Sequence, residues 1–241
     1  MKQILAIYIL LLAPLAVTWA DDRPSGKPMI GRLPVAKVLF LGNSITLHAP
    51  APAIGWTGNW GMAASAQEKD FVHLLTADIA GAAGTKPETK VRNIADFERG
   101  YDTFDIEKEF QEELHFNAEL VIVAIGENVA EPATDEARAS FAAAFARLLS
   151  VLKQHGQPAI FVRSSFWPNQ TKDHILRKAS ADAGVTFVDI AKLGGDKSNA
   201  ASSERKIEHA GVAAHPGDKG MKAISDEMFA AIRRKAGLAA K

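Results

Sequence analysis

The feature that most constrains this sequence is a series of short apolar runs separated by longer amphipathic stretches. The run from Val38 to Leu41 contains no polar residue and ends at Gly42, which is typical of a strand buried on both faces of a parallel sheet. Comparable runs, the first of them shorter, occur at 90–94, 120–125, 159–162 and 185–190. The chain is therefore expected to form a five-stranded parallel sheet.

Helical spacing of apolar residues fills the intervals between these runs. One stripe begins at Phe71 and precedes Gly81, and a longer one begins at Phe141 and stops at Gly156. Three further segments are expected to be helical: 105–114, 175–179 and 221–232. Because each crossover between parallel strands must cover the sheet, this alternation predicts a flavodoxin-like, three-layer α/β/α fold. Functional groups in such folds gather at the carboxyl ends of the strands.

The N-terminal sequence has the pattern of a secretory signal peptide over residues 1–20. Lys2 precedes an apolar run, and small residues lead to a cleavage position after Ala20. The apolar run is shorter than the roughly 20 residues that span a bilayer, so we expect an exported, periplasmic or secreted protein without stable membrane insertion of the mature domain. Residues 21–34 are expected to form an N-terminal arm, and 35–241 a single domain.

Composition excludes several classes of function. Lys and Arg together number 28, as do Asp and Glu, so no net charge favours nucleic acid or an anionic surface. The absence of cysteine excludes disulfides, thiolate catalysis and cysteine-ligated zinc. No pair of histidines has metal-binding spacing on a helix, and no glycine-rich segment fits a dinucleotide loop, so neither a metal nor a cofactor is expected. The oligomeric state stays open.

Three polar side chains fall at the expected carboxyl edge of the sheet. Ser44 follows the first strand, Asn128 follows the third, and His215 lies on a loop with Pro216 before the last helix. Each alone has an ordinary structural reading, as a helix cap, a turn residue or a surface histidine. Together they supply a nucleophile, an oxyanion donor and a general base, which predicts acyl transfer.

The segment Gly42-Asn43-Ser44-Ile45-Thr46 resembles the first block of the SGNH, or GDSL-type, hydrolases, and the resemblance extends over roughly 35–232. It implies a flavodoxin-like fold and hydrolysis of carboxylic esters, often acetyl or other acyl groups on carbohydrates or lipids. On this resemblance, Ser44 is the nucleophile and its N–H an oxyanion donor. Asn128 matches the family's asparagine, which supplies a further hydrogen-bond donor to the oxyanion, and His215 matches the family's histidine, which is the general base.

Three positions depart from the pattern of that family. Ala95 stands where a glycine normally supplies an oxyanion N–H, which an alanine backbone retains, and Val129 replaces the aspartate that usually follows the asparagine. Val212 replaces the acid three residues before His215. Because that acid normally orients the imidazole, either Glu208 or a main-chain carbonyl must take its place.

Other polar residues near these positions are assigned structural roles. His48 is expected to be a loop residue, and His209 is a rival base that lacks the neighbouring proline of His215. Asp218 is expected to cap the last helix.

Two loops near the expected crevice carry aromatic rings beside amides. One contains Trp56, Asn59 and Trp60, and the other contains Trp167. Exposed rings of this kind stack on sugar faces, although the same rings can instead pack a loop onto the domain. We expect these residues to bind a glycan, so the predicted substrate is an O-acylated carbohydrate or a small ester.

Three functional hypotheses follow. The first is a serine esterase that works through an acyl-enzyme. The second is a catalytically impaired, glycan-binding module of the same fold, which the missing acid favours. The third is an O-acyltransferase that passes the acyl group to a sugar hydroxyl.

Overall fold

The computed structural model describes residues 27–239, so the predicted signal peptide over 1–20 lies outside the described residues. Five parallel strands form one sheet in the order β4-β3-β5-β6-β7. Their bounds are β3 Lys37–Gly42, β4 Glu88–Asn93, β5 Leu120–Ala124, β6 Ala159–Arg163 and β7 Thr186–Val188. All five predicted strands are present, and β7 is shorter than its apolar run.

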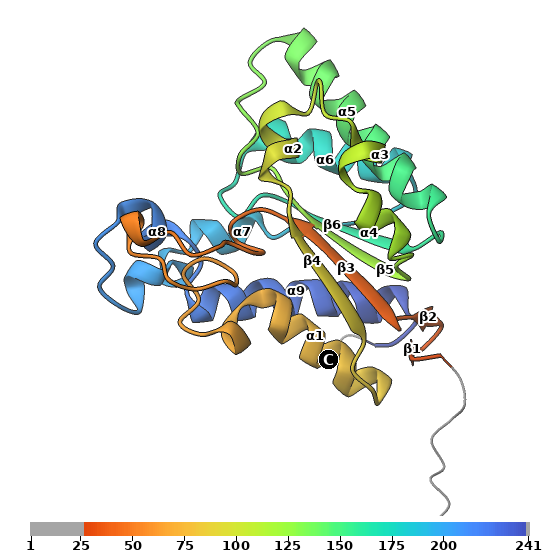
Figure 1. Ribbon diagram of the computed structural model, residues 1–241, viewed down its shortest axis with the longest axis horizontal. Helices are drawn as coiled ribbons and strands as arrows, with labels where there is room; N and C mark the ends of the chain where they lie inside the picture. The colour runs from red at the N-terminus through yellow and green to blue at the C-terminus, as the bar shows by residue number, and fades with distance from the viewer. Residues whose placement is uncertain (1–26, 240–241) are drawn as a thin grey trace, which may run out of the picture.

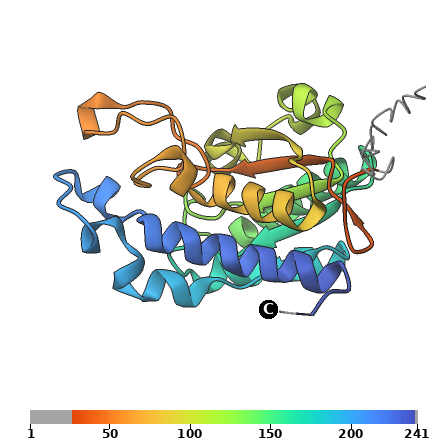
Figure 2. The same cartoon turned by 90° about the horizontal axis from the view of Figure 1, so that it is seen from below.

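Helices cover both faces of this sheet, as Figure 1 shows. One face carries α1 (Phe71–Ala83) and α9 (Asp218–Lys235), which lie side by side across the strands in Figure 2. The other face carries α2 (Ala95–Gly100), α5 (Asp135–Gln154) and α6 (Gln170–Asp182). The predicted three-layer, flavodoxin-like α/β/α architecture is confirmed.

The central strand shows why these residues form a two-sided sheet. Val38 and Phe40 of β3 pack into the core beneath α1 and α9, whereas Leu39 and Leu41 pack into the core beneath α5. Successive side chains of a strand point to opposite faces, so only a continuous apolar run fills both cores.

The polar segment predicted as one helix over 105–114 is two short helices. These are α3 (Ile106–Glu109) and α4 (Gln111–His115), separated by Phe110 in a non-helical conformation. The Phe110 side chain is fully buried in the core beneath α5. Burial of this ring accompanies the break in the helix, which apolar periodicity did not reveal. The remaining short helices are α7 (Ala191–Gly195) and α8 (Ala210–Ala214), and 3-10 turns occupy 52–54, 67–69, 197–199 and 201–203.

The segment predicted as an N-terminal arm contains an antiparallel hairpin of β1 (Met29–Ile30) and β2 (Leu33–Pro34). Ile30 and Leu33 are buried in the same core as α9. The N–H of Arg32 donates to the carbonyl of Ala236 at 3.3 Å, which ties the hairpin to the residue after that helix. This part of the arm therefore packs on the domain.

Two helix ends differ from expectation. Helix α1 continues through Gly81 to Ala83, and the next residue, Gly84, has a φ of 74°, the left-handed conformation that glycine adopts readily. Asp218 does not cap α9. The first N–H groups of that helix, from Asp218 and Lys219, donate instead to the Glu204 carboxylate at 2.9 and 2.7 Å. Asp218 accepts from Ser65 and Lys69, and so joins α9 to the loop before α1.

Within residues 27–239, no helix is both long and apolar enough to cross a bilayer.

Candidate active site

Ser44 and His215, which are 171 residues apart in the sequence, meet at the carboxyl edge of the sheet. Ser44 Oγ lies 2.8 Å from His215 Nε2. Ser44 lies in the turn that follows β3, and His215 lies between α8 and α9. This distance is short enough for direct proton transfer between hydroxyl and imidazole.

A main-chain carbonyl orients the imidazole. His215 Nδ1 lies 2.7 Å from the carbonyl oxygen of Gly211 in α8. Because a carbonyl only accepts hydrogen bonds, Nδ1 carries the proton and Nε2 is free to accept the proton of Ser44. Glu208 is exposed and makes no hydrogen bond to His215. Of the two alternatives for the missing acid, the structure has the main-chain carbonyl.

Val212 packs α8 against its neighbours and does not supply an acid to His215. Its side chain is buried in a small apolar cluster with Trp56, Met62, Ala63 and Ala201. Its methyl groups can neither accept a proton from His215 nor carry a charge. The cluster instead holds α8 in the position that presents the Gly211 carbonyl.

The environment of His215 favours the neutral form that a base requires. Burial lowers the pKa of His215, although the Gly211 carbonyl and the charge of Glu127 act in the opposite direction. The ring of Trp167 packs edge-on against the imidazole, with ring centroids 5.1 Å apart. Trp167 therefore shields one side of the base from water.

The turn that carries Ser44 depends on a close approach of backbone and side chain. A Cβ on Gly42 would lie 1.9 Å from Thr46 Oγ1 and 2.9 Å from the carbonyl oxygen of Ala124. Only glycine fits between these groups. The N–H of Ile45 donates to Asn43 Oδ1 at 3.2 Å, and the N–H of Thr46 donates to the Asn43 carbonyl at 2.9 Å. These bonds fix the turn that exposes the Ser44 hydroxyl.

Asn43 lies between two buried acids. Its amide nitrogen donates to Glu127 at 2.7 Å and to Glu98 at 3.3 Å. The Arg163 guanidinium forms a buried ion pair with Glu127 at 2.7 Å, and it holds the pKa of that carboxyl below the ordinary value against the opposing effect of burial. Burial and the charge of Glu127 raise the pKa of Glu98.

The three groups predicted to form the oxyanion hole line one cavity, and they differ in the hydrogen bonds they already make. The Ser44 N–H makes no hydrogen bond to another residue within 27–239. Asn128 Nδ2 donates to Glu98 Oε2 at 2.8 Å, which leaves its second hydrogen for a ligand. The N–H of Ala95 donates to Asn93 Oδ1 at 2.9 Å, so an oxyanion would have to share this donor with the Asn93 side chain.

One cavity of about 460 Å³ contains all of these groups. Ser44, Ala95, Asn128 and His215 line it. Its remaining walls are more polar than apolar in residue type: His48, Ile54, Met62, Asn93, Asp96, Arg99, His209, Gly211 and Val212. The sequence-predicted catalytic and oxyanion residues thus share one cavity.

His48 and His209 also line this cavity, but both have structural bonds. His48 Nδ1 lies 2.6 Å from the carbonyl oxygen of Ala49. His209 Nδ1 accepts the N–H of Val212 at 3.3 Å and caps α8. Neither is hydrogen-bonded to the Ser44 hydroxyl, which pairs with His215.

The predicted substrate-binding aromatics divide into two groups. The expectation of an exposed ring is corrected for Trp56, whose side chain is buried and packs edge-on against Trp60. The Trp60 indole is half-buried and donates to the carbonyl of Ala64 at 3.1 Å, whereas Asn59 is exposed. None of these three residues lines the cavity of Ser44. Trp167 does not line this cavity either, but it is 36% exposed and its ring packs against the imidazole of His215, which does line it.

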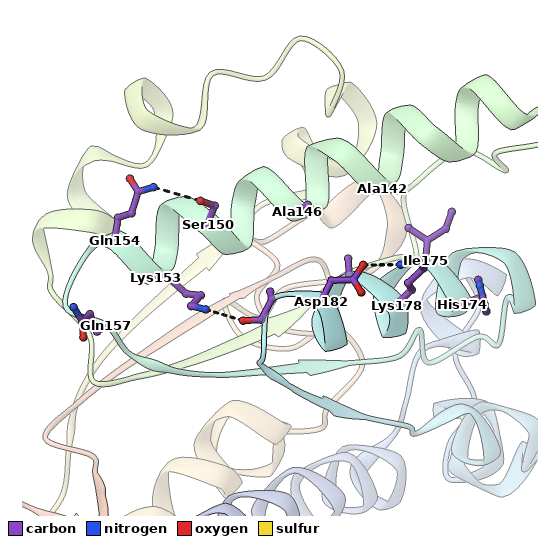
Figure 3. Close-up of a pocket in the computed structure, with 12 residues that line it drawn as sticks. Ala142, Ala146, Ser150, Lys153, Gln154, Gln157, His174, Ile175, Lys178 and Asp182 are labelled. Carbon is purple, nitrogen blue, oxygen red and sulfur yellow. Dashed lines mark hydrogen bonds and ion pairs between the residues drawn. The ribbon is translucent and has the colours of Figure 1, made fainter.

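A roomier cavity, of about 680 Å³, lies between α5 and α6 (Figure 3). Its polar side chains bond to neighbouring protein groups, as Lys153 does to the carbonyl of Ala183 and Lys178 to Asp182. The cavity contains no serine–histidine pair within hydrogen-bond reach. We therefore place the candidate active site in the smaller cavity, because chemistry and not size decides the assignment.

Sequence reasoning missed Glu98 and Arg99, and it left a main-chain carbonyl open as the partner of His215 without identifying Gly211. Glu98 and Arg99 belong to a segment with many charged residues that reads as a solvated surface helix. A backbone carbonyl leaves no signal in the residue types. Across residues 27–239, no three His, Cys, Asp or Glu side chains are grouped as metal ligands would be.

Comparison with known proteins gives structural similarity alone. No family model matches the chain. No curated protein matches it in sequence. A protein from Bacteroides uniformis, described provisionally as a GDSL-like lipase, aligns with a TM-score of 0.53 at 15% identity over 83% of this chain and 97% of its own. The acetyl xylan esterase AlAXEase aligns at 0.52 and 16% identity, over 81% and 99%.

A third similar structure is a family two carbohydrate esterase from Cellvibrio japonicus, with a TM-score of 0.51 and 19% identity over 85% of this chain and 62% of that one. At such identities the likeness concerns the arrangement of strands and helices. This chain has the SGNH, or GDSL-type, hydrolase fold.

Proposed function

We propose that this protein is a serine esterase that hydrolyses carboxylic esters through an acyl-enzyme. The observation that carries the proposal is the 2.8 Å contact between Ser44 Oγ and an imidazole whose other nitrogen is fixed by a carbonyl. His215 Nε2 takes the hydroxyl proton as Ser44 attacks the ester carbonyl. The alcohol leaves with that proton, and water, activated in turn by His215, releases the acid and restores the serine.

Negative charge on the tetrahedral intermediate would be met by hydrogen-bond donors of the same cavity. These are the Ser44 N–H, the Asn128 amide and the Ala95 N–H shared with Asn93. A single donor of this kind contributes about 10²–10³ in turnover. The Gly211 carbonyl orients His215 but carries no full negative charge, so it stabilises the imidazolium less than a carboxylate would.

For the substrate, we propose an acetylated or similarly acylated carbohydrate. The exposed ring of Trp167 beside His215 offers an apolar face for a sugar, and the polar side chains that line the cavity offer hydrogen-bond partners. Similar structures include a two-domain esterase active on acetylated mannans, which aligns with a TM-score of 0.54 at 11% identity over 85% of this chain and 50% of its own. The signal-like pattern of residues 1–20 supports export to the periplasm or the medium, where the enzyme would meet acylated carbohydrates.

A fluorophosphonate probe tests the proposal directly. The activated Ser44 should be labelled and the Ser44→Ala variant should not, and the same substitution should abolish turnover of acetylated sugars and p-nitrophenyl acetate. Labelling that persists in Ser44→Ala would reject the assigned nucleophile. A chain that binds glycan but is neither labelled nor active would favour the binding-module hypothesis, and acyl transfer to an added alcohol in place of hydrolysis would favour the transferase.

A further inference from the structure

Two charged side chains of α2 hold opposite ends of the Asn128 amide. Asn128 Nδ2 donates to Glu98 Oε2 at 2.8 Å, and Arg99 Nη2 donates to Asn128 Oδ1 at 3.1 Å. Glu98 is fully buried, whereas Arg99 is exposed and lines the cavity of Ser44. Neither residue takes part in the proton transfers of the proposed reaction.

This arrangement allows one orientation of the amide. Glu98 accepts in each of its hydrogen bonds, from Asn43, Gly126 and Asn128, and a guanidinium only donates. With the amide reversed, oxygen would face oxygen at Glu98 and N–H would face N–H at Arg99. The Asn128 nitrogen is therefore held on the Glu98 side and its oxygen on the Arg99 side.

Glu98 is itself fixed by the backbone around Asn128. Its Oε1 accepts the N–H of Gly126 at 2.7 Å and the N–H of Asn128 at 3.2 Å. Gly126 has a φ of 126°, and a Cβ there would lie 2.3 Å from Ser165 Oγ, so the turn after β5 has little freedom. The acceptor for the amide nitrogen is thus rigid. Arg99, in contrast, is exposed to solvent, so the donor to the Asn128 oxygen has more freedom to move than the acceptor.

We propose that Glu98 and Arg99 are positioning residues that select the Asn128 orientation in which its amide nitrogen serves the oxyanion. The inference rests on the proposed esterase function. The hydrogen bond from the guanidinium to Oδ1 also polarises the amide, which strengthens donation from the nitrogen. Both residues act through Asn128, so their effects should depend on it.

A double-mutant cycle with p-nitrophenyl acetate tests this dependence. Arg99→Met removes the donor, and Glu98→Gln places an amide where Asn128 requires an acceptor. Each is measured alone and with Asn128→Ala. Alone, each should lower kcat by about tenfold or more with KM little changed, because an oxyanion donor is misplaced. With Asn128→Ala already present, each should change kcat by less than about twofold. Arg99→Lys keeps a donor and should retain most of the turnover.

The controls separate positioning from folding and from substrate binding. Arg147→Gln removes an exposed arginine that pairs with Glu107, and because neither residue lines this cavity it should leave kcat unchanged. Thermal unfolding checks that the variants fold, and Arg99 is exposed, so its variants test the proposal even if Glu98→Gln is unstable.

Three results would overturn the inference: equal losses of kcat with and without Asn128, no loss in Arg99→Met, or a rise in KM alone. If the parent chain shows no turnover that depends on Ser44, the esterase proposal itself fails and this inference fails with it. That outcome is distinguishable because it appears in the parent chain before any α2 variant is measured.

Discussion

His215 must be neutral to accept the proton of Ser44, and its burial lowers its pKa below the ordinary imidazole value of about 6.5. The neutral base therefore persists to lower pH than in a solvated histidine. We expect kcat/KM for ester hydrolysis to fall only as the pH drops through a value below about 6.5, and to be flat from there to neutrality. Stopped assays of product acid over this range, with Ser44→Ala as the blank, measure how kcat/KM falls at acidic pH. A midpoint at or above pH 7 would contradict the neutral, buried base.

Asn43 donates to two buried acids, so an aspartate is unfavourable at its position. An aspartate would bring a third carboxylate against Glu98 and Glu127 and would remove the donor that both share. Hydrogen bonds to charged groups contribute about 1.5–3 kcal/mol, so Asn43→Asp should lower the free energy of unfolding by about 2 kcal/mol or more at neutral pH. Urea unfolding measures the change, with the exposed Asn59→Asp as control. Equal stability of the two variants would show that the acids tolerate a third charge.

At the scale of elements, the start of α9 follows the His215 loop directly, and Glu204 holds it. The Glu204 carboxylate accepts the first two N–H groups of the helix, although it is 14 residues away in the sequence. Loss of a capping side chain costs about 0.5–2 kcal/mol. Glu204→Ala should therefore lower the free energy of unfolding by about 1 kcal/mol, whereas Glu107→Ala, which removes an exposed ion pair, should have a smaller effect. Similar midpoints in urea for both variants would contradict the capping role.

Elements differed in how far the sequence could predict them. The five strands followed from continuous apolar runs, because only a strand buried on both faces needs them. The helix expected over 105–114 was divided at Phe110, since the periodicity of a polar segment does not report where one ring enters the core. Asp218 was expected to cap its own helix, but the cap came from Glu204, a contact made by tertiary structure.

Over the whole molecule, the predicted part of the site follows from sequence pattern and topology, whereas the rest depends on tertiary contacts. The proximity of Ser44 and Asn128 could be predicted because the topology of a parallel sheet brings the ends of its strands to one edge, whereas His215 was predicted from its place on a loop before the last helix. Glu98 and Arg99 could not be predicted, because a buried glutamate and a surface glutamate look alike in sequence. Glu98 is distinguished only by its hydrogen-bond partners. These include Asn43, which is 55 residues away in the sequence, and Asn128, which is 30 residues away.

The N-terminal hairpin allows stability and catalysis to be separated within one molecule. β1 and β2 precede the amino end of β3, whereas Ser44 follows its carboxyl end. Ile30 and Leu33 are buried against the core of α9, and full burial of such side chains contributes about 1.5–3 kcal/mol each, as an upper estimate. A chain that begins at residue 35 should therefore unfold at lower urea concentration than one that begins at residue 27, by several kcal/mol in free energy. Where both chains are folded, their Ser44-dependent kcat should agree, because no hairpin residue lines the active cavity. Equal unfolding midpoints would mean that the domain begins at residue 35, and unequal kcat at equal folded fraction would mean that the hairpin influences the site from the opposite end of the sheet.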